Sequence, residues 1–333
     1  MPKIAFRVSN SKKSGRGHLS RCLAIRKHLK GNVFWFLDQT FRDRDLKLCK
    51  NDKFILEDSN HSINNLSNFL KTKNFKIVIL DSYLISLKDI EYISNITFTV
   101  CICDFGPYPK SNLILNHQPN AKLGKNVLAG PKYAPILYSE SDLTINKTII
   151  KKQKIYKHST NKKNLLISFG TYDSLGIAAL VLKSLVESNY FFHKTSIVVL
   201  IGKSSPHLNY ISRLCKNIEN IQVLVEPENL LEIYHCSDLA VGAPGSSLFE
   251  RLFFGVPSVL VPQNNIHKIL TKNWVSKGVV LSAKNDSKSI LKNVRLLLEN
   301  QEECKKMSIL GKKIVDGKGA ERVSNVIKSI IEV

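Results

Sequence analysis

Residues 14–21 place two glycines beside a histidine and two arginines, in the order Ser-Gly-Arg-Gly-His-Leu-Ser-Arg. An apolar run at residues 4–8 precedes this stretch and an amphipathic run at residues 19–29 follows it, so the pattern predicts a strand, a glycine turn and a helix. Glycine lets the backbone turn tightly and approach a ligand closely, and the helix start presents unpaired N–H groups to that ligand. Gly15 and Gly17 are therefore candidate ligand-binding residues.

His18 stands at the start of the predicted helix. The positive end of the helix dipole disfavours an imidazolium, so we expect His18 to be neutral near pH 7, as a general base must be. Arg21 lies one turn further along the helix and is expected to reach the same ligand. The alternative is an ordinary strand-to-helix turn with a surface histidine, and two glycines alone do not decide between these interpretations.

Apolar runs alternate with helical segments through the first half of the chain; the runs are at residues 33–37, 53–56, 77–80 and 97–103, and one helical segment starts at Arg42. Such runs predict a parallel sheet buried on both faces, with ligands at the carboxyl ends of its strands. Asp81, Tyr83 and Asp104 follow two of these runs, as the His18 turn follows another. For Asp104 we favour the role of a turn former.

The same alternation restarts in the second half, with apolar runs at residues 165–169, 196–201, 221–225, 238–242 and 257–261. Between the halves, residues 146–163 are rich in lysine and have no apolar period, which predicts an exposed linker. We therefore predict an α/β protein of two doubly wound, Rossmann-like domains that face each other across a cleft. The predicted domains are residues 1–145 and 164–333, with the last helix packing back on the first domain.

Ser246 and Ser247 stand where another glycine turn is predicted to open a helix, and Glu250 follows one turn later. Hydroxyls and N–H groups at a helix start can hold a phosphate, and a carboxylate can accept hydrogen bonds from both hydroxyls of a ribose. The alternative is a capping box, in which Glu250 turns back to the N–H of Ser247, and spacing alone slightly favours it. Gly170 and Thr171 are second candidates for phosphate contact, and a helix is expected from about Asp173.

The chain has 333 residues and a formal net charge of +22, from 49 Lys and Arg against 27 Asp and Glu. A charge of this sign attracts anions, including nucleic acids. No basic motif with interleaved aromatic residues occurs, however, so we favour lysines spread over the whole surface and expect no nucleic-acid partner.

The seven cysteines are scattered and odd in number, and their spacing completes no zinc site. No apolar run reaches the length of a membrane span, and the first residues lead into a strand without a signal-peptide pattern. We therefore expect a cytoplasmic protein, monomeric or weakly associated, with reduced cysteines and with no bound metal or other cofactor.

Several motifs follow one another along the whole chain. They are Arg7 with the Gly-Arg-Gly-His turn, Asp-Ser-Tyr at 81–83, Leu-Ala-Gly-Pro-Lys-Tyr at 128–133, Ile-Ser-Phe-Gly at 167–170, Gly-Ser-Ser at 245–247 with Glu250-Arg251, Gly-Val-Pro at 255–257, and Asp-Gly-Lys-Gly-Ala-Glu-Arg-Val at 316–323. Together they resemble the nucleotide-sugar hydrolases of pseudaminic acid biosynthesis. These enzymes remove UDP from UDP-2,4-diacetamido-2,4,6-trideoxy-β-L-altropyranose and are related to GT-B glycosyltransferases of the MurG type.

The resemblance implies a GT-B-like architecture, with acceptor chemistry in the first domain and UDP in the second. His18 matches the histidine expected to activate water, and Tyr83 matches the tyrosine beside it. Ser246, Ser247 and Glu250 match the residues on the UDP side, which makes the capping box the minority interpretation for Glu250.

The chain also departs from the family pattern. Thr171 and Tyr172 stand where the family usually has a second glycine and a small residue, and Ser9-Asn10 replaces an acidic residue expected after Arg7. The counterpart of the family's Asn-Gln pair is Asn264, Asn265 or His267, of which we take Asn265 as a substrate-binding candidate.

The function that the resemblance implies is hydrolysis of a UDP-sugar, with release of UDP and a free diacetamido-trideoxy sugar. His18 would take a proton from water as the water attacks the anomeric carbon. A UDP-sugar-dependent inverting glycosyltransferase, in which a hydroxyl replaces water, is the first alternative. A non-catalytic nucleotide-sugar binding protein is the second.

Overall fold

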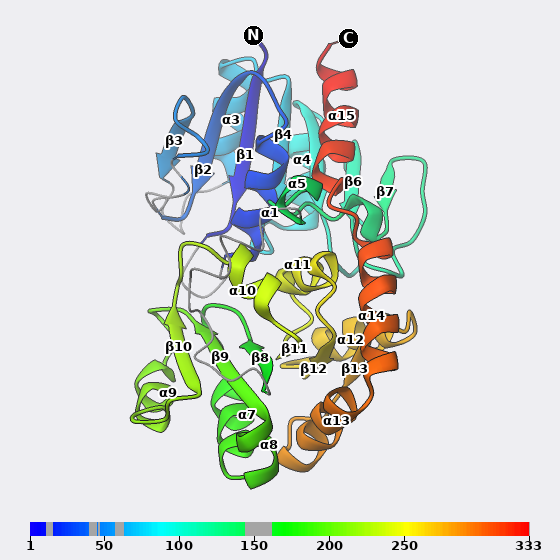
Figure 1. Cartoon of the computed structure of the whole chain (residues 1–333). Coiled ribbons are helices and arrows are strands. Elements are labelled where there is room, and N and C mark those ends of the chain that lie inside the picture. Colours follow the sequence, from blue (N-terminus) through cyan, green and yellow to red (C-terminus); the bar gives the residue numbers. More distant parts are fainter. Residues whose placement is uncertain (11–15, 40–44, 46, 57–62, 144–161, 333) are drawn as a thin grey trace. The chain divides into compact units, whose positions relative to one another are not determined.

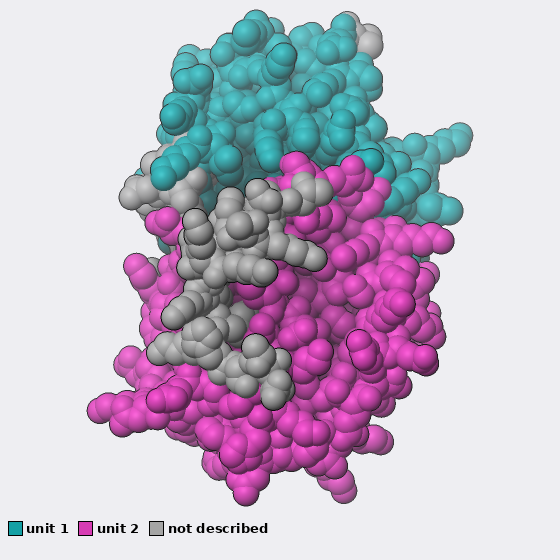
Figure 2. Space-filling model, in the orientation of Figure 1, with its two compact units in different colours: residues 1–137, 317–333 teal, residues 138–316 magenta. Residues whose placement is uncertain are grey.

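Figure 1 shows a computed structural model of the chain, which describes residues 1–10, 16–39, 45, 47–56, 63–143 and 162–332. The predicted helical start at Arg42, Gly15 and most of the predicted linker lie outside the described residues. The chain divides into two compact units, coloured separately in Figure 2. Unit 1 comprises Met1–Leu137 and Gly317–Val333, and unit 2 comprises Tyr138–Asp316.

Unit 1 contains a seven-stranded sheet in the order β3-β2-β1-β4-β5-β6-β7, and every neighbouring pair is parallel. Its apolar runs form strands because their alternate side chains can be buried on both faces of the sheet. The strands are β1 (Lys3–Val8), β2 (Asn32–Leu37), β3 (Lys53–Leu56), β4 (Ile77–Asp81), β5 (Phe98–Ile102), β6 (Leu113–Asn116) and β7 (Val127–Ala129). The helical segments are α1 (Gly17–Arg26), α3 (Ile63–Thr72), α4 (Leu87–Ser94), the 3-10 turn η1 (Pro131–Tyr133) and α15 (Gly319–Ile331).

Two apolar clusters form the core of unit 1 on the two faces of its sheet. One cluster joins β1, β2 and β4 to α1 and α15, and the other joins the same sheet to α3 and α4. Helix α15 packs on α1, where the Ser324 hydroxyl donates to the Ile25 carbonyl at 3.0 Å. At the start of α15, a Cβ on Gly319 would overlap the backbone of Ala134, so only glycine allows this approach.

Unit 2 contains a six-stranded parallel sheet in the order β10-β9-β8-β11-β12-β13. The strands are β8 (Lys163–Ser168), β9 (Thr195–Ile201), β10 (Ile221–Val225), β11 (Leu239–Gly242), β12 (Ser258–Leu260) and β13 (Val280–Ser282). The helices are α5 (Glu140–Leu143), α7 (Ile177–Val186), α8 (Asn189–Lys194), α9 (Leu208–Leu214), α10 (Leu231–Cys236), α11 (Ser246–Phe254), α12 (Asn265–Val275), α13 (Ser287–Glu299) and α14 (Gln301–Ile314). The prediction of two Rossmann-like α/β domains is confirmed.

Both sheets have a switch point. This is the place between two neighbouring strands from which the chain continues toward opposite edges of the sheet. In unit 1 it lies between β1 and β4, and in unit 2 between β8 and β11. The loops that follow such a pair of strands diverge, and ligands of doubly wound sheets bind in the crevice that they leave. The residues after β1, β4, β8 and β11 are therefore the candidate ligand-binding residues. Among the described residues, no helix is long and apolar enough to cross a membrane.

Candidate functional site

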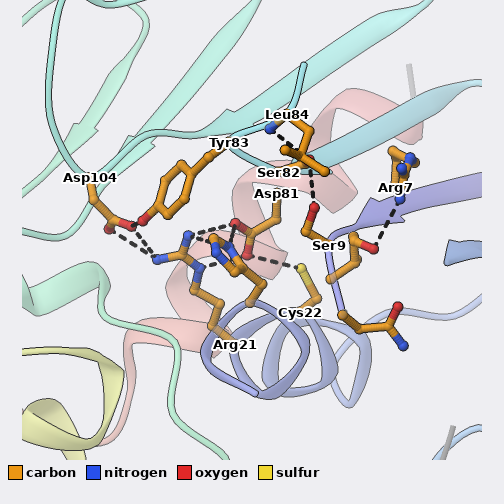
Figure 3. Close-up of polar contacts among 12 residues, drawn as sticks. Arg7, Ser9, Arg21, Cys22, Asp81, Ser82, Tyr83, Leu84 and Asp104 are labelled. Carbon is orange, nitrogen blue, oxygen red and sulfur yellow. Dashed lines mark hydrogen bonds and ion pairs between the residues drawn. The ribbon is translucent and has the colours of Figure 1, made fainter. Parts of the chain in front are cut away.

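A buried cluster of charged side chains lies at the switch point of unit 1 (Figure 3). His18 and Arg21 come from the first turns of α1, Asp81 ends β4, and Asp104 follows β5. Each of the four residues is less than a tenth exposed. Because β1, β4 and β5 are neighbours in the sheet, residues far apart in the sequence meet at one edge.

Arg21 joins the two carboxylates of this cluster. Its Nε donates to Asp81 Oδ2 at 2.6 Å and its Nη2 donates to Asp81 Oδ1 at 2.5 Å. Its Nη1 donates to both oxygens of Asp104, at 3.0 and 2.8 Å. The guanidinium, which we expected to contact substrate, is thus taken up by two carboxylates and fixes their separation.

The imidazole of His18 is oriented by Asp81, with 2.6 Å between Nδ1 and Asp81 Oδ1. Although burial alone would raise the pKa of Asp81, the charge of Arg21 and the hydrogen bonds from Arg21 and His18 lower it to about 2, so the carboxyl is ionised near pH 7. A nitrogen this close to a carboxylate oxygen must carry the proton, which assigns the Nδ1–H tautomer. In a neutral imidazole with this tautomer, Nε2 keeps its lone pair and can accept a proton.

Asp104 has further polar neighbours after β4 and β6, of which Tyr83 and Gln118 donate hydrogen bonds to it. The Tyr83 hydroxyl donates to Asp104 Oδ2 at 2.6 Å, and His117 Nε2 and Gln118 Nε2 lie 3.3 and 3.4 Å from Oδ1. Although burial opposes it, the charge of Arg21 and these contacts hold the pKa of Asp104 well below its usual range. Asp104 is therefore a structural member of the cluster, and its interpretation as a simple turn former is wrong.

Tyr83 lies beside His18, as the resemblance implied, with 4.6 Å between the two ring centroids in an edge-to-face arrangement. Burial of its hydroxyl and the neighbouring Asp104 carboxylate raise the pKa of Tyr83, so the hydroxyl stays protonated. The residue as a whole is 55% exposed. Its hydroxyl is bonded inside the cluster while much of the side chain remains accessible.

In unit 2, the loop after β11 leads into helix α11. The helix begins at Ser246, with Gly245 as the N-cap residue and no side-chain cap. Within the described residues, no acceptor bonds the backbone N–H groups of Gly245, Ser246 and Ser247 or the two serine hydroxyls. Unbonded N–H groups and hydroxyls at a helix start are suited to binding an anion.

Glu250 lies one turn into α11 and is 9% exposed. Its Oε2 accepts a hydrogen bond of 2.7 Å from the hydroxyl of Tyr234 on α10. The capping-box interpretation is wrong, because a box at Ser247 requires that residue to be the N-cap and the N-cap is Gly245. Glu250 is held instead by contact with another helix.

The other predicted phosphate turn of unit 2, after β8, is built differently. Gly170 has a φ of +84°, which favours glycine, and the Thr171 carbonyl accepts from the Gly202 N–H at 3.0 Å. The buried Asp173 carboxylate accepts from the N–H groups of Ile177 and Ala178 at 3.1 and 3.0 Å. Helix α7 therefore begins at Ile177, later than expected, and its first donors are already bonded to a carboxylate of the chain.

Asn264 and Asn265 open helix α12 after β12. The Asn264 side chain accepts from the His267 N–H at 2.8 Å and caps the helix. Asn265 is exposed, and its Oδ1 lies 3.3 Å from Lys268 Nζ. The structure thus gives Asn264 a capping role and leaves Asn265 as the accessible amide.

No protein-family model matches the chain. Over 296 residues it is 27% identical to an uncharacterized protein of Methanocaldococcus jannaschii, a match that covers 83% of this chain and 58% of that protein. Over 257 residues it is 24% identical to the UDP-2,4-diacetamido-2,4,6-trideoxy-β-L-altropyranose hydrolase of Campylobacter jejuni, covering 75% of this chain and 88% of the hydrolase. The chain thus spans a little over half the length of the first of these relatives.

The fold is also that of solved enzyme structures. The UDP-GlcNAc 2-epimerase from Neisseria meningitidis, bound to UDP-GlcNAc, matches with a TM-score of 0.73 and 16% identity, covering 98% of this chain and 100% of that one. The chain has the GT-B fold.

Within this GT-B fold, sequence reasoning missed two parts of the sites. His117 and Gln118 follow β6, and the short apolar run at residues 113–115 before them is a signal that could have found them. Arg251 was noted only as part of a motif, and nothing in its spacing indicates that its guanidinium is buried. Among the described residues, no group of three or more His, Cys, Asp or Glu side chains is placed to hold a metal ion.

Proposed function

We propose that the chain hydrolyses a UDP-sugar with His18 as the general base. The observation that carries this proposal is the contact of 2.6 Å between His18 Nδ1 and Asp81, which leaves Nε2 as a proton acceptor. Nε2 takes a proton from water while the water oxygen forms a bond to the anomeric carbon. The bond from that carbon to the UDP oxygen breaks, and its electron pair leaves with UDP. A single displacement of this kind inverts the anomeric configuration.

The charge of the cluster supports this role. The two carboxylates and Arg21 carry a formal charge of −1 when both histidines are neutral. Burial lowers the pKa of His117 to about 4, so His117 remains neutral near pH 7. An imidazolium that forms at His18 brings the sum to zero in a buried site. The cluster therefore stabilises the charge that develops on His18 during proton transfer.

Unit 2 supplies the nucleotide site in this proposal. Ser246 and Ser247 offer hydroxyls and unbonded N–H groups to the diphosphate, and Glu250 offers its carboxylate to the ribose. Gly170, Thr171 and Asn265 are further substrate-binding candidates, and Gly17 at the start of α1 lies next to His18. The C. jejuni relative is named a hydrolase of a UDP-sugar, which supports the substrate class.

The test is UDP release from a panel of UDP-sugars in the absence of any acceptor, followed by NMR of the anomeric proton of the sugar product. We expect stoichiometric UDP and free sugar of inverted configuration. A His18→Gln variant should release little, whereas His28→Gln, a change just after the same helix, should match the unaltered chain. No UDP from any sugar, or equal rates in the two variants, would contradict the proposal.

A glycosyltransferase is the second candidate, because apolar side chains near His18 are exposed. Tyr83, Leu84 and Phe105 are 55, 72 and 38% exposed, and the Tyr83 and Phe105 rings lie 5.1 Å apart. Such a surface suits an acceptor with an apolar face. UDP release that occurs only when a hydroxyl acceptor is added would favour this candidate. Tight UDP-sugar binding without any turnover would favour the non-catalytic binding protein.

A further inference from the structure

Arg251 is a fully buried cation on α11 that the proposed reaction does not use. Its Nη2 donates to the Ala243 carbonyl at 2.7 Å, and its Nε donates more weakly to the Ser247 carbonyl at 3.4 Å. Both carbonyls belong to residues 243–247, which we call the serine loop because it includes Ser246 and Ser247. The guanidinium therefore holds the serine loop from its buried side.

The guanidinium is incompletely compensated. Its buried Nη1 has no hydrogen-bond partner among the described residues, and none of their carboxylates lies within ion-pair distance of it. Burial lowers the pKa of Arg251 to about 10, although the charge of Glu250 opposes that shift, so the side chain remains a cation at pH 7. A buried charge without a paired counter-charge is costly, which is a reason to look for an anion that binds nearby.

The place of Arg251 points to the switch point of unit 2. A Cβ on Gly242 would overlap both the Arg251 guanidinium and the carbonyl oxygen of Ser168. Gly242 ends β11 and Ser168 ends β8, so the guanidinium lies against the ends of the two strands that border the crevice. The same crevice is bordered by the serine loop, in which the N–H groups of residues 245–247 have no acceptor within the described part of the chain.

Helix α7, which starts at the same edge of the sheet, is the contrasting case. Its first donors, the N–H groups of Ile177 and Ala178, are bonded to Asp173, a carboxylate of the chain itself. A second anion there would meet the negative charge of Asp173. Within the described residues, the start of α11 has no carboxylate as a cap, and the buried cation Arg251 lies behind it.

We propose that Arg251 is a positioning residue for a nucleoside diphosphate. It fixes the serine loop through the two carbonyls, and its charge is balanced when the diphosphate binds to the loop. This proposal rests on the proposed function for the presence of a uridine nucleotide in unit 2, but it does not depend on hydrolysis. It predicts that Arg251 strengthens the binding of ligands that carry the phosphates and does not affect the binding of the nucleoside alone.

Calorimetric titration with UDP, uridine and inorganic pyrophosphate tests the proposal on the full chain and on two variants. Arg251→Met removes the charge at similar length, and we expect the affinity for UDP and pyrophosphate to fall about tenfold or more. Uridine affinity should stay within about threefold. Arg295→Met on α13 is the matched control, since Arg295 is half-exposed and pairs with Glu299, and it should leave all three affinities unchanged.

Equal losses of UDP and uridine affinity in Arg251→Met, or an unchanged UDP affinity, would overturn the proposal. If Arg251→Met does not fold, the same titrations on Arg251→Lys test the proposal. Lysine keeps the charge but cannot hold both carbonyls in the same way. We expect it to weaken UDP severalfold and uridine not at all, and unchanged UDP affinity would overturn the proposal. Failure of the unaltered chain to bind UDP and pyrophosphate would also overturn it. Binding of both without turnover of any UDP-sugar would overturn only the proposed hydrolysis.

Discussion

The switch points of the two units have the same topology but arrange their buried charges differently. In unit 1, the buried groups between β1 and β4 are two carboxylates, one arginine and a histidine, with a formal charge of −1. In unit 2, the buried carboxylates Asp173 and Glu250 are held by other groups of the chain, and a buried arginine lies beside two serines and N–H groups that have no acceptor within the described residues. One edge is equipped to accept a proton, and the other is equipped to hold an anion.

The difference shows how one fold takes on two tasks through the residues after its strands. In unit 1 the arginine is paired with two carboxylates, so its charge is neutralised within the cluster and it holds the carboxylates in place. In unit 2 the arginine bonds neutral carbonyls and has no paired carboxylate among the described residues, so its charge remains available to a ligand. The first arrangement rigidifies a base, and the second prepares an anion site.

Removing the base should separate the two tasks most strongly. His18→Gln keeps hydrogen bonding but cannot take up the proton, so kcat should fall by about 10²- to 10⁴-fold. KM should stay within a few-fold, because unit 2 holds the nucleotide in our proposal. Steady-state kinetics of UDP release measures both values, with His28→Gln as control. Near-normal kcat in His18→Gln would remove His18 from the chemistry.

Asp81→Asn should have the next largest effect. An amide at this position can donate to Nδ1 and so favour the tautomer with the proton on Nε2, which cannot act as base; we expect kcat to fall about 10²- to 10³-fold. Asp38→Asn is the matched control, because Asp38 also pairs with an arginine, Arg7 at 2.9 Å, but does not contact His18. Equal kcat values in the two variants would show that Asp81 acts only on stability.

Glu250→Ala should act on the nucleoside half of the ligand. If Glu250 accepts hydrogen bonds from the ribose, calorimetry should show about tenfold weaker binding of both UDP and uridine. This result contrasts with Arg251→Met, which should affect the phosphates alone. Glu250→Gln keeps an acceptor for the Tyr234 hydroxyl and serves as the control for folding. Unchanged nucleotide affinity with a lowered melting temperature would assign Glu250 to structure.

The smallest expected effect concerns the buried His117 of unit 1. Burial lowers its pKa to about 4, below the value of about 6.5 for a free histidine. Between these values the unfolded chain binds more protons than the folded one, so stability should fall as the pH is lowered from about 6.5 to about 4. Thermal unfolding of His117→Gln should be less pH-dependent over this range, by a few degrees. Parallel curves for the variant and the unaltered chain would contradict this.

The sequence was sufficient to predict ten of the described strands and the edge at which the site residues gather, whereas the short strands β6, β7 and β13 were missed. Continuous apolar runs predicted β3 and β10 with their observed bounds, and the position of Asp81 after such a run placed it at the ligand-binding edge. The inference for Asp81 holds because β4 is buried on both faces, which leaves a continuous apolar signature. Strands β3 and β10 lie at the sheet edges and are only partly buried, so their apolar residues alone identified them.

The partners of these residues could not be predicted, because they depend on which strands are neighbours. The local sequence around His18 indicates only the dipole of its own helix, whereas Asp81, 63 positions away, contacts its ring. Asp104 looked like a turn residue because Arg21 is far from it in the sequence. Arg251 sits one position after Glu250, and only the packing of α11 against the strand ends shows that it is buried.

The measurement that tests the division of tasks most directly is the UDP affinity of a chain that has lost its base. Calorimetric titration of His18→Gln with UDP should give a dissociation constant within about twofold of the unaltered chain, although its turnover is lost. A loss of tenfold or more in UDP affinity would show that His18 belongs to the nucleotide site, and would contradict the assignment of proton transfer to one switch point and anion binding to the other.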